Sequence, residues 1–148
     1  MPWSHGSYVD APTSPLFPFG FGLSYGRCVL SSLRLLTSTA GSAVPAVVSI
    51  DVAVDADAAS GCSEVVQCYV RDPPTRHVRR WQRLVGFQRV KLHGGAERRR
   101  TVRIELKSSA LAVLDDAGHW RVLPGEYAVA CGASSIGPNA LEATMNLL

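Results

Sequence analysis

The chain has 148 residues, of which 47% are hydrophobic and 18% charged, so a folded globular chain is expected rather than a disordered one. Its net charge is +3, and the basic run Arg98–Arg100 opens an alternating strand pattern that sends side chains to both sides, so no nucleic-acid partner is expected. No apolar run approaches the roughly 18 residues of a membrane span. Residues 1–10 lack the basic start and apolar core of a secretory signal. Membrane association and a signal peptide are therefore not expected, and the sequence assigns no compartment.

The first 26 residues differ from the rest because they are rich in proline, glycine, serine and aromatic residues. Their prolines interrupt any regular element, which predicts an extended segment. Residues 15–25 are nevertheless too apolar for a solvated linker. We expect this segment to dock on a protein surface through five large side chains: Phe17, Phe19, Phe21, Leu23 and Tyr25.

From residue 28 onward the pattern is mostly that of β-strands, with one brief helix expected in 108–114. Apolar side chains alternate with polar ones in 48–54 and 101–106, the period of a half-buried strand. Further strands are expected in 64–70, 84–92, 127–131 and 140–148, and a hairpin turn in 115–118. About seven short strands without a long helix predict an all-β sandwich or barrel.

Tyr127 follows a Pro-Gly turn at the start of a strand. Immunoglobulin-type and fibronectin-type sandwiches often carry a tyrosine there, whose hydroxyl bonds to backbone a few residues upstream. This position favours the sandwich, and an ordinary strand-facing tyrosine is the alternative.

The four cysteines form no CxxC pair, and the four histidines are scattered, so no metal or cofactor is expected. An even number of cysteines permits two disulfides, but a chain of this length does not need them to fold. Cys68 and Cys131 fall inside apolar strands, where we expect free buried thiols.

Four segments resemble motifs of the family 3 glycoside hydrolases, the β-glucosidases and β-xylosidases. Residues 15–25, PLFPFGFGLSY, are similar to the family's "PLYPFGYGLSY". Residues 64–70, EVVQCYV, are similar to "EVVQLYV", and 84–90, LVGFQRV, to "LKGFQRV". Residues 120–127, WRVLPGEY, are similar to "WVVEPGEY". The four motifs also occur in the family's order, and together they imply the C-terminal fibronectin type III-like domain of that family.

The resemblance implies an immunoglobulin-like (fibronectin type III-like) β-sandwich over 27–148, preceded by the extended segment 1–26. In the family this segment lies at the junction with an α/β sandwich domain, which has no counterpart in this chain. The implied function is that of a non-catalytic accessory domain which braces the catalytic domains of a β-glucosidase or β-xylosidase. Without its partner, the apolar segment is expected to promote self-association. The alternative is a free-standing carbohydrate-binding or adhesion module, which would not need a docking segment.

No residue of the chain matches the family's nucleophile or its acid/base, so no catalytic residue is carried over and the chain alone is expected to be inactive. Among the carboxylates, Asp115 and Asp116 are expected to form a turn, and Asp55 and Asp57 a solvated loop. A polysaccharide contact is considered at Trp81, which lies among arginines, whereas Trp120 is expected to pack over the sandwich.

Overall fold

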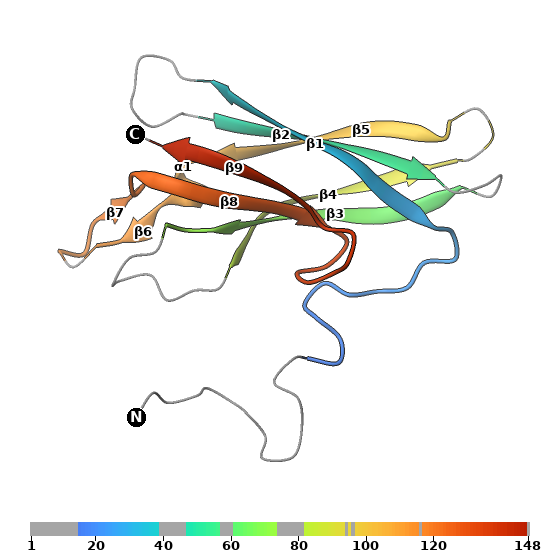
Figure 1. The fold of residues 1–148 in the computed structure, drawn as a ribbon, viewed down its shortest axis with the longest axis horizontal. Coiled ribbons are helices and arrows are strands. Elements are labelled where there is room, and N and C mark those ends of the chain that lie inside the picture. The colour runs from blue at the N-terminus through green and yellow to red at the C-terminus, as the bar shows by residue number, and fades with distance from the viewer. Residues whose placement is uncertain are drawn as a thin grey trace.

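The computed structural model describes residues 15–38, 47–56, 61–73, 82–93, 95, 97–115 and 117–147. In this part of the chain two antiparallel sheets face each other and form a β-sandwich (Figure 1). The three-stranded sheet has the order β1-β2-β5 and the four-stranded sheet the order β4-β3-β8-β9, while β6 and β7 form a separate two-stranded ribbon. The predicted all-β sandwich is therefore confirmed.

The elements run in chain order as β1 (Cys28–Ser38), β2 (Val47–Ala56), β3 (Cys62–Arg71), β4 (Arg83–Leu92), β5 (Arg99–Lys107), α1 (Ser108–Leu111), β6 (Val113–Leu114), β7 (Trp120–Arg121), β8 (Gly125–Gly132) and β9 (Leu141–Leu147). The strands expected in the second half of the chain are all present, and the brief helix is the single turn α1. The sequence patterns did not predict β1. Its pairing with β2 shifts register between Leu30 and Ser32, so its apolar side chains do not keep a period of two.

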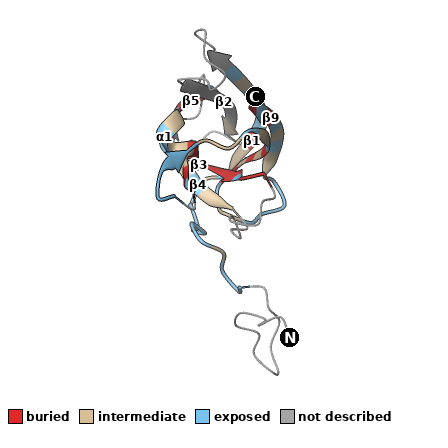
Figure 2. Ribbon diagram, turned by 90° about the vertical axis from the view of Figure 1, so that its left-hand side faces the viewer, coloured by how far each residue is buried: buried red, intermediate tan, exposed pale blue. Residues whose placement is uncertain are grey.

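Apolar side chains from both sheets fill the space between them. In β5, Val102, Ile104 and Leu106 are buried while their neighbours are exposed, as the alternation predicted. The four-stranded sheet contributes the inward side chains of β3, β8 and β9, of which Val66, Val70 and Val129 are fully buried. Figure 2 shows the buried residues lying between the two layers, whereas the described part of the N-terminal segment is mostly exposed.

The expectation of free thiols at Cys68 and Cys131 is wrong, because the two residues form a disulfide. They face each other across β3 and β8, with their Cα atoms 4.3 Å apart. Directly opposed residues of a non-hydrogen-bonded antiparallel pair lie about 4.5 Å apart at Cα and bring their side chains closest together. The pairing register, which the sequence does not reveal, places the two sulfur atoms side by side. A second disulfide joins Cys28 to Cys62 and so connects the starts of β1 and β3, which belong to different sheets.

Tyr127 occupies the position predicted from the Pro-Gly turn. Its ring is fully buried, and its hydroxyl donates a 2.7 Å hydrogen bond to the carbonyl oxygen of Leu123. Burial, with a further contribution from the nearby Asp72 carboxylate, raises the pKa of Tyr127. Asp72 itself is nearly buried and is neutralised by Arg83, whose guanidinium group bonds both carboxylate oxygens. The tyrosine corner of a fibronectin-type sandwich is therefore present.

Candidate docking interface

The described part of the N-terminal segment, 15–27, runs along the outer face of the four-stranded sheet, beside the loop between β8 and β9 (Figure 1). It makes a tight turn at Pro18–Phe21, where the amide of Phe21 donates a 3.0 Å hydrogen bond to the carbonyl oxygen of Pro18. Gly20 is the third residue of this turn and has a φ of 77°. A type II turn needs a positive φ at its third residue, so glycine is the natural residue there.

Gln67 of β3 fixes this turn to the sandwich. Its side chain points outward yet is buried, with an exposed fraction of 6% for the residue. The amide nitrogen Nε2 donates to the carbonyl oxygen of Gly20 at 3.2 Å and to that of Ala133 at 2.6 Å. The amide oxygen Oε1 accepts a hydrogen bond from the hydroxyl of Tyr69. One buried amide therefore joins the N-terminal segment, the outer face of β3 and the β8–β9 loop.

Further polar contacts hold the segment on either side of Gln67. The amide of Ser135 in the β8–β9 loop donates a 2.9 Å hydrogen bond to the carbonyl oxygen of Phe19. The hydroxyl of Ser24 donates a 3.0 Å hydrogen bond to the carbonyl oxygen of Ser63 in β3. Immediately after the segment, the Cys28–Cys62 disulfide ties the start of β1 to the start of β3. Backbone and polar groups thus place the segment at several points along its length.

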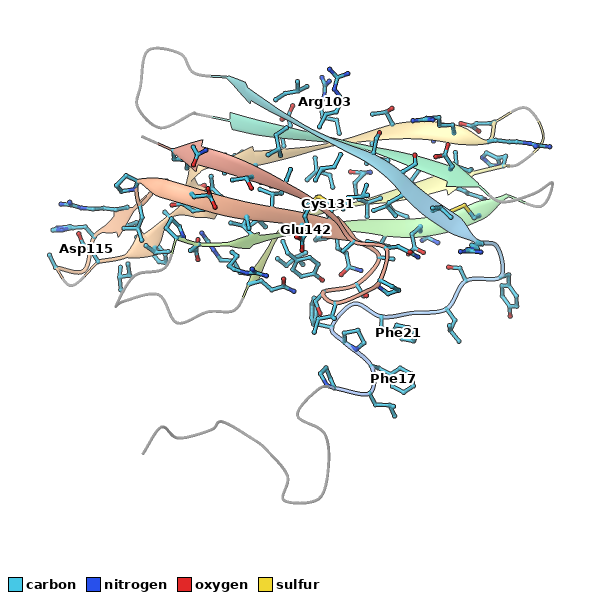
Figure 3. All side chains as sticks on the ribbon, viewed as in Figure 1. Phe17, Phe21, Arg103, Asp115, Cys131 and Glu142 are labelled. Atoms are coloured by element: carbon cyan, nitrogen blue, oxygen red, sulfur yellow. A yellow bond between two sulfur atoms is a disulfide. The ribbon has the colours of Figure 1, made fainter. Side chains whose placement is uncertain are left out.

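The large side chains of the segment, by contrast, are exposed. Phe17 and Phe19 are 65% and 68% exposed, Leu23 is 91% exposed and Tyr25 is fully exposed. The rings of Phe17 and Phe21 contact each other, with centroids 5.2 Å apart, and Figure 3 shows both below the sandwich. The segment is therefore held on the sandwich, but its large side chains are not buried there. The segment is attached to the sandwich by its backbone and by the Ser24 hydroxyl, while its large apolar side chains remain largely exposed.

Other apolar side chains continue this exposed surface onto the sandwich. Leu84 and Phe87 project from the outer face of β4, and Ile136 from the β8–β9 loop. We call the exposed apolar side chains of the segment and these three together the linker face, which comprises Leu16, Phe17, Phe19, Phe21, Leu23, Tyr25, Leu84, Phe87 and Ile136. Contiguous apolar patches of this kind on a protein surface mark sites of interaction.

A groove of about 430 Å³ lies within the linker face, between the segment and strands β3 and β4. Phe19 and Leu23 line it on one side, and Leu84 and Phe87 on the other. Arg89 borders the groove, and its guanidinium group donates a 3.1 Å hydrogen bond to the Ser63 hydroxyl. The groove can receive an apolar side chain from a partner surface, with a cation at its edge.

Sequence reasoning found the apolar residues of the segment but missed the groups that position them. Gln67 lies in a strand whose neighbours are apolar, and a buried glutamine in such a run needs hydrogen-bond partners. A glutamine within an apolar strand was therefore the sequence signal that could have identified Gln67 as an anchor. The sequence predicts a strand that contains Leu84 and Phe87, but it does not predict that their side chains lie on the outer face of the sheet.

The remaining candidates from the sequence do not join this interface. Trp81, Asp57 and Asp116 lie outside the described residues. Asp115 has the turn role that was expected, because its carboxylate accepts the backbone amides of Ala117 and His119 at 3.0 and 2.8 Å. Trp120 is 70% exposed, so the expectation that it packs over the sandwich is wrong.

The described part of the chain shows neither a metal-binding cluster nor a membrane-spanning helix. It contains no group of three or more histidine, cysteine or acidic side chains that could hold a metal ion. Among its helices, none is long and apolar enough to cross a membrane.

Comparison with known families and proteins gives a single answer. Residues 64–135 match the family described as the fibronectin type III-like domain. The chain is 35% identical over 130 residues to a β-xylosidase of Formosa agariphila, which covers 88% of this chain and 17% of that protein. It is 37% identical over 123 residues to a β-glucosidase of Rhizobium radiobacter, covering 82% of this chain and 14% of that protein. The chain thus spans about a sixth of these relatives.

Solved structures agree with the sequence relatives. A β-glucosidase from Erythrobacter marinus superposes with a TM-score of 0.81 and 29% identity, over 97% of this chain and 18% of that chain. A β-glucosidase from Streptomyces venezuelae, solved with D-glucose, gives a TM-score of 0.78 and 28% identity, over 91% of this chain and 16% of that chain.

Proposed function

The chain belongs to the fibronectin type III-like domains of family 3 glycoside hydrolases, and we propose that it serves such an enzyme as a non-catalytic domain that braces the catalytic domains through the linker face. The comparisons with known families and proteins confirm the resemblance deduced from the four sequence motifs. The proposal concerns the partner and the surface that binds it.

One observation carries the proposal: the linker face is ordered by the sandwich but not covered by it. Gln67 and Ser24 hold the segment in one conformation while its aromatic side chains remain exposed. Fully burying one such side chain is worth roughly 1.5–3 kcal/mol. A surface that is already ordered before the partner binds also avoids part of the entropic cost of association. These properties support a preformed half of an interface.

Asp115 and Asp72 do not supply the pair of carboxylates that a hydrolytic site would need. A retaining glycosidase needs two carboxylates about 5–5.5 Å apart on either side of the scissile bond. The carboxylate of Asp115 accepts hydrogen bonds from amides of its own hairpin and forms an ion pair with Arg121, whose Nε lies 2.8 Å from Oδ2. Asp72 is buried against Arg83. We therefore expect no turnover of aryl β-glucosides or β-xylosides by the isolated chain, and turnover that a carboxylate substitution in this chain abolishes would contradict the proposal.

A chimera tests the bracing role directly. The matching segment of the Rhizobium radiobacter β-glucosidase is replaced by this chain, and the chimera is compared with one carrying Phe19→Ser, Phe21→Ser and Leu23→Ser. We expect the triple variant to lower the thermal stability of the chimera's catalytic activity, while leaving the unfolding temperature of the isolated chain nearly unchanged. Equal inactivation temperatures of the two chimeras would count against docking through the linker face.

The isolated chain provides a second test, because an uncovered linker face is expected to pair with another copy. Light scattering should show association that grows with concentration and is lost in the triple variant. A Trp120→Ser variant, which changes an exposed aromatic residue elsewhere, is the matched control and should associate like the wild type. A wild-type chain that stays monomeric at high concentration would argue against this self-association.

A further inference from the structure

A second groove lies away from the linker face, beside the β6–β7 hairpin. It has a volume of about 500 Å³ and is lined by Ser108, Ser109, Ala112, Trp120 and Val122. Pockets of roughly 300–1,000 Å³ with apolar or aromatic walls and a few polar groups are typical of small-molecule sites.

The aromatic wall of this groove is an exposed tryptophan held by a short β-ribbon. Trp120 pairs directly with Leu114 across β6 and β7, and both side chains are exposed, at 70% and 54%. Asp115 fixes the loop between these strands, since its carboxylate accepts two loop amides and its backbone amide donates to the carbonyl oxygen of His119. The indole is therefore displayed on a defined support rather than on a free loop.

The polar wall consists of two serines of α1. Their hydroxyls make no hydrogen bond within the part of the chain that the structure describes. A serine hydroxyl can donate one hydrogen bond and accept two, so both hydroxyls are available to a ligand. All five lining residues are uncharged, and the nearby Arg121 is engaged by Asp115. The groove thus suits an uncharged ligand with one apolar face and a polar edge.

We propose that this groove, formed by Trp120, Ser108 and Ser109, binds an uncharged oligosaccharide. A pyranose ring has a face of C–H groups, which stacks on the indole, and a rim of hydroxyls, which the two serines can bond. Tryptophan suits this role because it combines a large apolar surface with an N–H donor. A charged ligand is disfavoured because no charged side chain lines the groove.

The groove lies away from the linker face, so a ligand can bind there whether or not the linker face is docked. Figure 3 shows Asp115, at the hairpin, well apart from Phe17 and Phe21 on the segment. A domain that is docked through the segment can therefore contact a saccharide at the hairpin. The two proposals can fail separately.

Titration of the 148-residue chain with xylohexaose and with cellohexaose, followed by calorimetry and by tryptophan fluorescence, tests this inference. We expect saturable binding of at least one hexasaccharide. Trp120→Ala should weaken it by roughly tenfold, which corresponds to about 1.4 kcal/mol. The double variant Ser108→Ala, Ser109→Ala should weaken binding while leaving the exposure of Trp120 unchanged.

Two controls make the outcome specific. Phe87→Ala removes an exposed aromatic side chain of the linker face and should bind like the wild type. Trp81→Ala tests the candidate from the sequence, and we expect it also to bind like the wild type. Unfolding curves should show that each variant is folded. The inference is overturned if neither hexasaccharide binds the wild type, or if Trp120→Ala binds as tightly as Phe87→Ala.

Discussion

The two faces of the four-stranded sheet are organised in opposite ways. On the inner face, Val66 and Val70 of β3 are fully buried and pack against apolar side chains of the other sheet. On the outer face of the same strand, Gln67 and Tyr69 are nearly buried. The Gln67 amide donates a hydrogen bond to Gly20 of the covering segment and accepts one from the Tyr69 hydroxyl. The large apolar side chains of that segment remain exposed.

The difference shows how one strand can serve both a core and an interface. Apolar burial on the inner face provides the driving force for folding, roughly in proportion to the area removed from water. Hydrogen bonds on the outer face add little net stability, but they require specific geometry because an unpaired buried amide is costly. The inner face therefore stabilises the sandwich, and the outer face sets the conformation of a surface that remains uncovered.

Truncating one aromatic residue on each face should give the largest difference in the free energy of unfolding. Tyr127→Ala on the inner face removes a fully buried ring and should lower the free energy of unfolding by about 3–5 kcal/mol. Phe87→Ala on the outer face removes a ring that is 65% exposed and should change it by about 0.5 kcal/mol or less. Urea unfolding of both variants measures the difference. Similar losses would mean that the linker face contributes to the core, which contradicts the comparison.

The sequence predicted the inner face better than the outer one. Alternation in β5 and the tyrosine corner at Tyr127 are local signals, and both were confirmed. The strand β1 was missed because a register shift near Leu30 breaks the alternation on which the prediction relies.

The interface was predicted only in part, because its anchors are not local. Gln67 meets Gly20 across 47 residues and Ala133 across 66, and no periodic pattern connects such distant positions. The same limit explains the cysteines. Cys68 and Cys131 are 63 residues apart, and only the register of β3 against β8 shows that they are opposed. The sequence indicated the five large side chains of the segment, but not that they remain exposed or that Leu84, Phe87 and Ile136 extend the linker face.

Removing a disulfide should produce the next largest loss in the free energy of unfolding. The two disulfides should also differ in how their removal affects the outer face. The loop-entropy relation gives about 4.3 kcal/mol for Cys68–Cys131 and about 3.8 kcal/mol for Cys28–Cys62, from their sequence separations of 63 and 34. Measured values for disulfides are commonly about 2–4 kcal/mol. We expect the paired alanine substitutions at 68 and 131 to destabilise the sandwich as a whole.

The Cys28–Cys62 pair should behave differently in a local measurement. Its removal frees the start of β1 next to the N-terminal segment, so amide exchange in 20–24 should accelerate more than in the Cys68–Cys131 variant. Thiol titration of the denatured wild type should find no free cysteine. Two reactive thiols mapped to Cys68 and Cys131 would restore the interpretation that these residues are unpaired.

Loss of the anchor on the outer face should lower the free energy of unfolding by less than loss of a disulfide. Gln67→Ala removes the donor of two hydrogen bonds and the acceptor of the Tyr69 hydroxyl, so it should cost about 1–3 kcal/mol. Gly20→Ala should cost a similar amount, because a φ of 77° is strained for alanine and a Cβ there would clash with Oε1 of Gln67. Gly22→Ala is the matched control, since a Cβ at that glycine meets no atom within 4 Å.

Combining the two substitutions tests whether they act on one contact. Gln67→Ala removes the atoms that a Cβ at position 20 would strike, so only the backbone strain at that position remains in the double variant. The two losses should therefore sum to more than the loss of the double variant, by about 0.5 kcal/mol or more, as expected for residues in direct contact. Exchange of the Phe21 and Ser135 amides should accelerate in each single variant, while that of Val129 in the core should follow global stability alone. Additive losses, with exchange unchanged at Phe21, would show that Gln67 does not hold the segment and that the outer face is not organised by this amide.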